Sequence, residues 1–194
     1  MDLKKFEALS DAHRPARSLI WQDWAEWRTF LEFSSAYFAA RGIDHPLAVE
    51  IGVMHNEQRV FYRELLGAEH IGIDINVNNA PDILGDSSLP EVAEKLKALL
   101  GGREIDLLFI DGNHTDAGVR ADYALYGPLT RHLVAFHDVH GVTNRADGVN
   151  GAWNDIAASG EYPTAVFHRY GKTVSIAAGQ YVNMGIGVII KDRK

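Results

Sequence analysis

The stretch IDLLFIDGNH, residues 105–114, passes from a nearly pure apolar segment into a turn with a carboxylate and an imidazole. Its apolar part is typical of a central strand covered on both faces. Further runs typical of strands lie at 47–51, 70–75, 82–84, 133–136, 164–168 and 184–190, and helical periodicity lies between them at 56–66, 88–101, 115–126 and 152–158. This alternation predicts an α/β fold with a doubly wound parallel sheet, and an α+β domain with mixed pairing is the alternative.

Residues 1–44 are predicted to be helical. Apolar or small side chains recur there at spacings of three or four, at Ile20, Trp24, Trp27, Leu31, Ser34 and Phe38. Such a face packs on a core or on a second subunit of a homodimer, or it forms a lid over a substrate. We therefore divide the chain into an N-terminal helical extension, 1–44, and an α/β domain, 45–194.

Composition narrows the function classes. The chain has 194 residues, enough for one core, and a formal net charge of -7 without a Lys/Arg cluster, which argues against a nucleic-acid partner. It has no cysteine, so disulfides and Cys-based metal sites are excluded. No apolar stretch is long enough to span a bilayer, and the N-terminal lysines precede no apolar segment of the kind a signal peptide has. We expect a soluble cytoplasmic protein with no membrane partner.

A carboxylate stands at the end of each of the first five predicted strands, at Glu50, Asp74, Asp86, Asp111 and Asp138. A single Asp at such a place is explained equally well by turn or cap formation. Five together are not, because neighbouring strands lie about 4.8 Å apart and like charges at that spacing repel. In an open parallel sheet ligands bind at this edge. A cation or a set of hydroxyl groups would neutralise the cluster.

The chemistry of the strand ends favours a cationic nucleoside. Asp74 suits a ribose diol, and Asp111 and Asp138 suit a hard divalent cation, with His137 or His114 nearby. The first turn, residues 52–57, lacks the three glycines of a dinucleotide site and is flanked by glutamates that would repel phosphates. S-adenosylmethionine carries a sulfonium, an ammonium and a ribose, so this site fits it better.

Five motifs resemble those of class I S-adenosylmethionine-dependent methyltransferases: Val49-Glu50-Ile51-Gly52, Gly72-Ile73-Asp74-Ile75, Gly85-Asp86-Ser87, Ile110-Asp111-Gly112-Asn113-His114 and Phe136-His137-Asp138. The small-molecule branch, with the cephalosporin hydroxylase-like proteins and the magnesium-dependent macrolide-sugar O-methyltransferases, is the most similar. The resemblance covers about residues 46–190. It implies a Rossmann-like methyltransferase domain with a mostly parallel sheet of seven strands, the last of them antiparallel.

The same resemblance implies site roles. Glu50 and Gly52 are expected near the methionine part of the cofactor, Asp74 with the adjoining Ile75 at the ribose, and Asp86 and Ser87 at the adenine. Asp111 is expected to contact the cofactor as well, and Asp111, His137 and Asp138 match the positions where such enzymes hold a metal ion.

The sequence thus predicts metal-assisted O-methylation of a small-molecule hydroxyl, because a metal both orients a hydroxyl and lowers its pKa. Mg²⁺ or another hard divalent cation is the expected ion. The candidate catalytic histidines are His137, as a metal ligand, and His114 or His140, as the base. Segments 140–150 and 170–183 are candidate walls of the acceptor site.

Two other functions stay open. The pairing of Gly85-Asp86 with Gly112-Asn113-His114 faintly resembles metallophosphoesterases, although their opening Asp-x-His is missing. A non-catalytic cofactor-binding or scaffold domain is favoured by Asn56-Glu57 in the first turn, where methyltransferases often have a pair of glycines.

Overall fold

A seven-stranded sheet forms the centre of the molecule in a computed structural model that describes residues 1–13, 20, 22–140, 148–168, 173–176, 179–182 and 185–192. The strand order is β3-β2-β1-β4-β5-β9-β6. The strands are β1 (Leu47–Ile51), β2 (Glu69–Asp74), β3 (Ile83–Leu84), β4 (Ile105–Ile110), β5 (Thr130–His137), β6 (Thr164–Phe167) and β9 (Ile186–Ile190). Strands β1 to β5 pair in parallel, and β9 runs antiparallel to both β5 and β6. The doubly wound, mostly parallel sheet with an antiparallel last strand is therefore confirmed.

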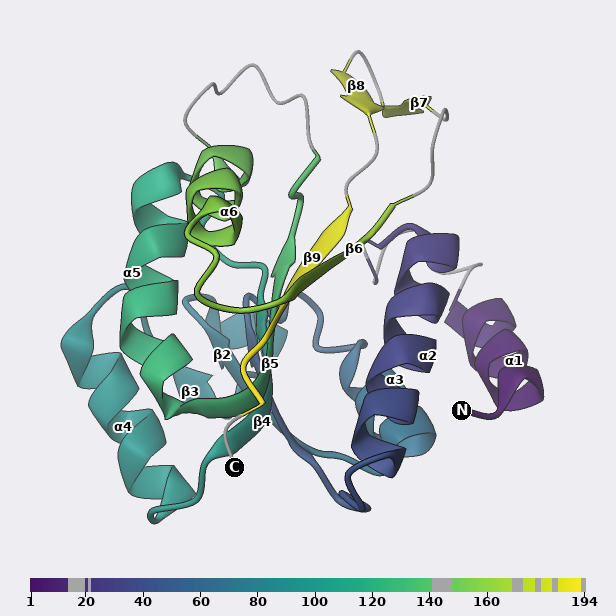
Figure 1. The fold of residues 1–194 in the computed structure, drawn as a ribbon, viewed down its shortest axis with the longest axis horizontal. Helices are drawn as coiled ribbons and strands as arrows, with labels where there is room; N and C mark the ends of the chain where they lie inside the picture. Colours follow the sequence, from purple (N-terminus) through teal and green to yellow (C-terminus); the bar gives the residue numbers. More distant parts are fainter. Residues whose placement is uncertain are drawn as a thin grey trace.

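Helices cover both faces of this sheet (Figure 1). One side carries α1 (Leu3–His13), α2 (Trp24–Ala39) and α3 (Arg59–Leu66), and the other carries α4 (Pro90–Leu100), α5 (Asp116–Tyr126) and α6 (Val149–Ala158). The 3₁₀ helices η2 (Val77–Asn79) and η3 (Gly127–Leu129) lie in connections, and β7 (Thr173–Ile176) pairs with β8 (Gly179–Val182) outside the main sheet. No helix in the described ranges is long and apolar enough to cross a membrane.

Two hydrophobic clusters fill the space between the sheet and its helices. Along β1, Val49 and Ile51 join the cluster under α4, α5 and α6, while Ala48 joins the cluster under α2 and α3. This alternation follows from the two-residue period of a strand. Glu50 shares the side of Ala48, and its side chain is fully buried. Strand β4 is buried along nearly its whole length, as its apolar run predicted.

Several element ends differ from the prediction, each for a local reason. Helix α3 begins at Arg59 rather than at 56, because Met54 and Asn56 adopt positive φ angles of 48° and 59°. Helix α2 begins at Trp24, where the carboxylate of Asp23 caps the amides of Ala25 and Glu26. The link from β2 to β3 holds only the 3₁₀ helix η2, so β3 has two residues.

The N-terminal helices are joined to the far edge of the sheet by polar contacts. The backbone amide of Gly185, just before β9, donates to Glu26 Oε2 at 2.9 Å. Arg41, just past α2, donates from Nε to the Asp192 carboxylate at 2.9 Å. Helix α2 is thus held against the sheet by its buried aromatic face and by contacts at both of its ends.

Candidate cofactor and acceptor site

A cavity of about 460 Å³ opens at the carboxyl ends of β1, β2, β3 and β4. Six of the seven residues predicted to contact a cofactor line it, namely Gly52, Asp74, Ile75, Asp86, Ser87 and Asp111. Ile75 is 72% exposed and forms part of the cavity wall. The strand ends therefore converge on one cavity, as expected for an open parallel sheet.

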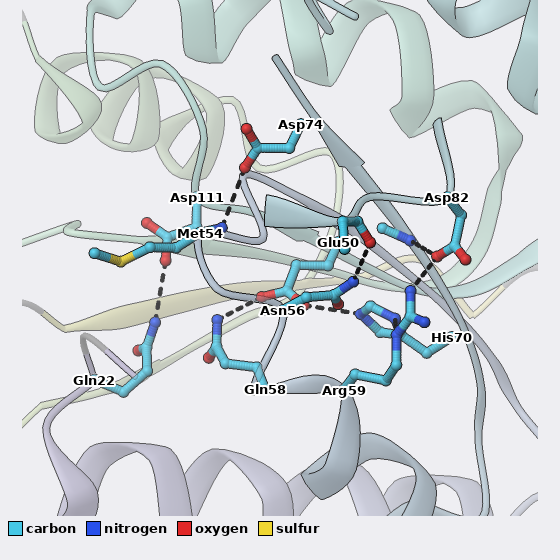
Figure 2. A network of polar contacts seen from close by, with 12 residues as sticks. Gln22, Glu50, Met54, Asn56, Gln58, Arg59, His70, Asp74, Asp82 and Asp111 are labelled. Atoms are coloured by element: carbon cyan, nitrogen blue, oxygen red, sulfur yellow. Dashed lines mark hydrogen bonds and ion pairs between the residues drawn. The ribbon is translucent and has the colours of Figure 1, made fainter. Parts of the chain in front are cut away.

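The first turn, after β1, approaches the neighbouring strand end very closely. Gly52 has φ of 84°, and a Cβ atom built on it would lie 2.3 Å from the Asp111 carbonyl oxygen. Only glycine fits there. The backbone amide of Met54 donates to the Asp74 carboxylate at 3.1 Å, and the Asn56 side chain donates to the Ala80 carbonyl at 2.8 Å. Two loops that line the cavity are thus bound to each other (Figure 2).

Glu50 is the one predicted cofactor-contact residue that does not line the cavity. Its contact with the methionine part of a cofactor stays a prediction. Its carboxylate points to the opposite side of β1, where it accepts from Gln58 Nε2 and contacts His70 Nε2 at 2.8 Å (Figure 2). Arg59 donates to His70 Nδ1 and also pairs with Asp82, so His70 carries its proton on Nε2. Burial raises the pKa of Glu50, and its contact with His70 opposes that shift. Glu50 thus holds Gln58, the residue just before α3, through a buried hydrogen bond.

Asp111 lies at the centre of a second group, with His114, His137 and Asp138. Its Oδ1 contacts His137 Nδ1 at 3.0 Å and His114 Nε2 at 3.1 Å. Asp138 lies 3.2 Å from His114 Nδ1 and 3.4 Å from His137 Nδ1. The structure thus brings these four side chains together.

The electrostatics of this group are dominated by its buried ion pair. Burial alone would raise the pKa of Asp111, but His137 and His114 lower it to about 2. Burial likewise acts to lower the pKa of His137, and the charges of Asp111 and Asp138 overcome this effect and raise it to about 9. The hydrogen bond to Asp111 raises the pKa of His114, and burial raises that of Asp138. At neutral pH His137 is an imidazolium.

Solved structures of methyltransferases resemble this arrangement of elements. The MycE methyltransferase of the mycinamycin biosynthetic pathway, in complex with Mg and SAH, aligns with a TM-score of 0.62 at 17% identity over 97% of this chain and 53% of that one. The O-methyltransferase TomG of Streptomyces achromogenes, in complex with SAM, aligns with 0.57 at 14% identity over 98% and 91%. The O-methyltransferase of Bacillus cereus, in complex with SAH, aligns with 0.55 at 16% identity over 98% and 92%.

The chain has the class I methyltransferase fold. It spans about half the length of MycE and nearly the full length of the other two. No family model matches the sequence, and no curated protein does either. Because the identities are this low, the likeness to these methyltransferases is one of fold.

The residues predicted to hold a metal ion, Asp111, His137 and Asp138, lie together but are engaged with one another. In the part of the chain that the structure describes, no group of three or more His, Asp or Glu side chains is arranged to hold an ion. His137 Nδ1 faces both carboxylates, and as an imidazolium it supplies the positive charge that an ion would otherwise bring.

Two residues of the N-terminal extension reach this group and were missed by the sequence analysis. Gln22 Nε2 donates to Asp111 Oδ2 at 3.1 Å, and the charge of Glu26 contributes to the raised pKa of His137. Both are nearly fully buried polar residues on or beside a helix with an apolar face. A polar residue on the apolar side of a predicted helix could have marked them as functional candidates. The sequence alone does not show which residues they contact.

His140 lies apart from the contacts just described. Its ring packs edge-on against that of His168, with centroids 4.5 Å apart, and burial lowers its pKa. Its role as the base therefore stays a prediction without a supporting contact. Of the two predicted acceptor walls, residues 141–147 and all side chains of 170–183 lie outside the described part of the chain.

Proposed function

We propose that this protein transfers the methyl group of S-adenosylmethionine to a hydroxyl oxygen of a small molecule. The observation that carries the proposal is the gathering of Asp74, Asp86 and Asp111 around one cavity at the strand ends. Carboxylates attract a sulfonium and an ammonium group and accept hydrogen bonds from a ribose, whereas they repel phosphates. The methyltransferase fold supports the same assignment.

The cofactor's parts can be assigned to these residues. Asp74 would accept from the ribose hydroxyls, with Ile75 against the nucleoside, and Asp86 and Ser87 would flank the adenine. Gly52 lines the cavity where the methionine part would lie. The bound cofactor supplies an electrophilic methyl group on a positively charged sulfur.

His114 is the proposed proton acceptor for the hydroxyl. Its side chain is 40% exposed, and it follows the cavity-lining Asn113. As the oxygen bonds to the methyl carbon, the carbon–sulfur bond breaks and the cofactor leaves as a neutral thioether. The hydroxyl proton passes to His114 Nδ1 after the acceptor hydroxyl has displaced the Asp138 carboxylate from that nitrogen. Asp111, which contacts His114 Nε2 at 3.1 Å, stabilises the resulting imidazolium, as a carboxylate does for the histidine of a catalytic triad.

Metal assistance is a finer form of this proposal. Asp111 and Asp138 have the carboxylate oxygens that Mg²⁺ prefers, with His137 as a third donor once it loses its proton. His137 Nδ1 contacts both carboxylates, so an ion bound there would have to replace these contacts. Two measurements on chelator-treated protein test this form: calorimetric titration with Mg²⁺, which measures ion binding, and methyl transfer with and without Mg²⁺. Unchanged activity without metal would refute it.

The N-terminal extension, residues 1–44, is proposed to cover the acceptor side of the site. The contact of Gln22 with Asp111 favours this role over a dimer element. Gln22→Ala should alter acceptor turnover more than cofactor affinity. A stable dimer in gel filtration that dissociates when the apolar face of α2 is changed would favour the other interpretation.

Calorimetric titration tests the central proposal. S-adenosylmethionine or its demethylated product should bind at micromolar concentration, while NAD⁺ and ATP should not. Asp74→Ala should weaken that binding at least about tenfold by removing the ribose acceptor, and Asp155→Asn, at an exposed position, is the matched control. Absence of binding by either cofactor form would refute the proposal, and metal-dependent cleavage of a phosphoester would favour the phosphoesterase alternative.

A further inference from the structure

Asp122 is a buried acid that the proposed reaction leaves without a role. It lies on α5 with no exposed surface, and neither carboxylate oxygen has an aligned hydrogen-bond donor. The Ser87 side chain comes close enough to lower its pKa, but without the alignment of a hydrogen bond. A buried carboxylate in this state is costly unless it binds a proton or gains a partner.

The position of Asp122 connects it to the cavity. A Cβ atom on Gly112, a cavity-lining residue, would lie 3.8 Å from Asp122 Oδ2. One helical turn further on, the Tyr126 hydroxyl donates to the Ser87 carbonyl at 2.9 Å. Two consecutive turns of α5 therefore face the loop Gly85–Ser88, whose Asp86 and Ser87 line the cavity. Asp122 is the buried neighbour of the part proposed to hold the adenine.

We propose that Asp122 is a positioning residue for the loop Gly85–Ser88, and that cofactor binding releases its proton. The inference rests on the proposed function. When an adenine amine donates to Asp86, the negative charge facing Asp122 is compensated, and the loop becomes fixed. The Ser87 hydroxyl can then donate to an ionised Asp122. The proton leaves to solvent, and no other group changes its bonds.

The charges around Asp122 are consistent with the loss of its proton on cofactor binding. Burial raises its pKa to about 6, and the charge of Asp86 acts in the same direction. Asp86 itself has a lowered pKa, because the hydroxyl and amide of Ser88 donate to it, so it stays ionised. Burial raises the pKa of Tyr126, so that hydroxyl stays neutral. The buried side chains that α4, β4 and α6 add to this core are apolar. Asp122 is thus the group here that titrates near pH 6.

Linkage then sets the direction of the effect. A ligand that favours the ionised form binds more tightly as the pH rises through the pKa of the free protein. At pH 5 about one Asp122 in ten is ionised, so affinity should be about tenfold lower there than at pH 7.5. A residue that merely stabilised the fold would change the amount of folded protein but not the number of protons released on binding.

The test is calorimetric titration of the demethylated cofactor at pH 5, 6 and 7.5, with two buffers of different ionisation enthalpy at pH 6. Wild-type protein should release about half a proton at pH 6. Asp122→Asn, which copies the neutral form, should remove this release and the corresponding part of the pH dependence, whereas Asp155→Asn should behave like wild type.

Ser87→Ala is the second variant. It tests the proton release from Asp122 even if Asp122→Asn fails to fold. It keeps the carboxylate but removes its donor, so the proton release should again be lost. Equal proton release in wild type, Asp122→Asn and Ser87→Ala would overturn the role of Asp122 while leaving the proposed function intact. No binding by any variant, wild type included, would overturn the proposed function and this inference with it.

Discussion

The ion pair between His137 and Asp111 should make the protein less stable in alkaline solution. The pKa of His137 rises from an ordinary 6.5 to about 9 in the folded protein, a difference that corresponds to about 3 kcal/mol of folding free energy. Because the folded pKa is raised, this contribution is fully present below pH 6.5 and is lost as the pH rises through 9. The lowered pKa of Asp111 expresses the same interaction and adds no further energy in this range.

Urea unfolding at pH 6, 7.5, 9 and 10 measures this effect. Wild type should lose about 3 kcal/mol of unfolding free energy across the series. His137→Gln, which keeps a donor but cannot be charged, should be less stable at pH 6 and should lack this part of the pH dependence. His45→Gln, at an exposed position, is the control. If the unfolding free energies of wild type and His137→Gln change in parallel with pH, the ion pair does not stabilise the fold. His137 would then not carry the proposed positive charge.

Three further variants test other contacts of the site. Gly52→Ala should lower the unfolding free energy by at least about 2 kcal/mol and abolish cofactor binding, because its Cβ would meet the Asp111 carbonyl; retained calorimetric binding would contradict this. Glu50→Ala should destabilise the protein by about 3 kcal/mol by leaving His70 buried without its partner, and in a double-mutant cycle with His70→Leu the losses should not add. His114→Gln should lower kcat about a hundredfold, measured as release of demethylated cofactor over a hydroxyl library, with cofactor affinity unchanged. Wild-type kcat should rise with pH through the raised pKa of His114, above 6.5, and a flat profile would argue against it as the base.

The sequence was sufficient for the sheet and for most of the cavity because both follow from local rules. Apolar runs separated by helical periodicity specify a parallel sheet, and the carboxyl ends of its strands meet at one edge, which brings Asp74, Asp86 and Asp111 together. Neither inference needs knowledge of a distant contact.

The parts that could not be predicted depend on partners far along the chain. Glu50 stands next to the end of β1, as a cofactor ligand would, but the alternation of the strand turns it toward His70 on β2. Gln22 contacts Asp111 across 89 positions of sequence, and no local pattern marks that pair. Met54 and Asn56 adopt left-handed backbone angles that glycine usually supplies, so the usual signal of glycine content was weak in the first turn.

The contacts of α2 with the region around β9 have a consequence for the order of folding. Glu26 binds Gly185 across 159 positions, Arg41 binds Asp192 across 151, and Ile186 and Val188 complete the hydrophobic cluster beneath α2. During synthesis the part of this cluster that Ile186 and Val188 cover therefore stays exposed until β9 emerges from the ribosome.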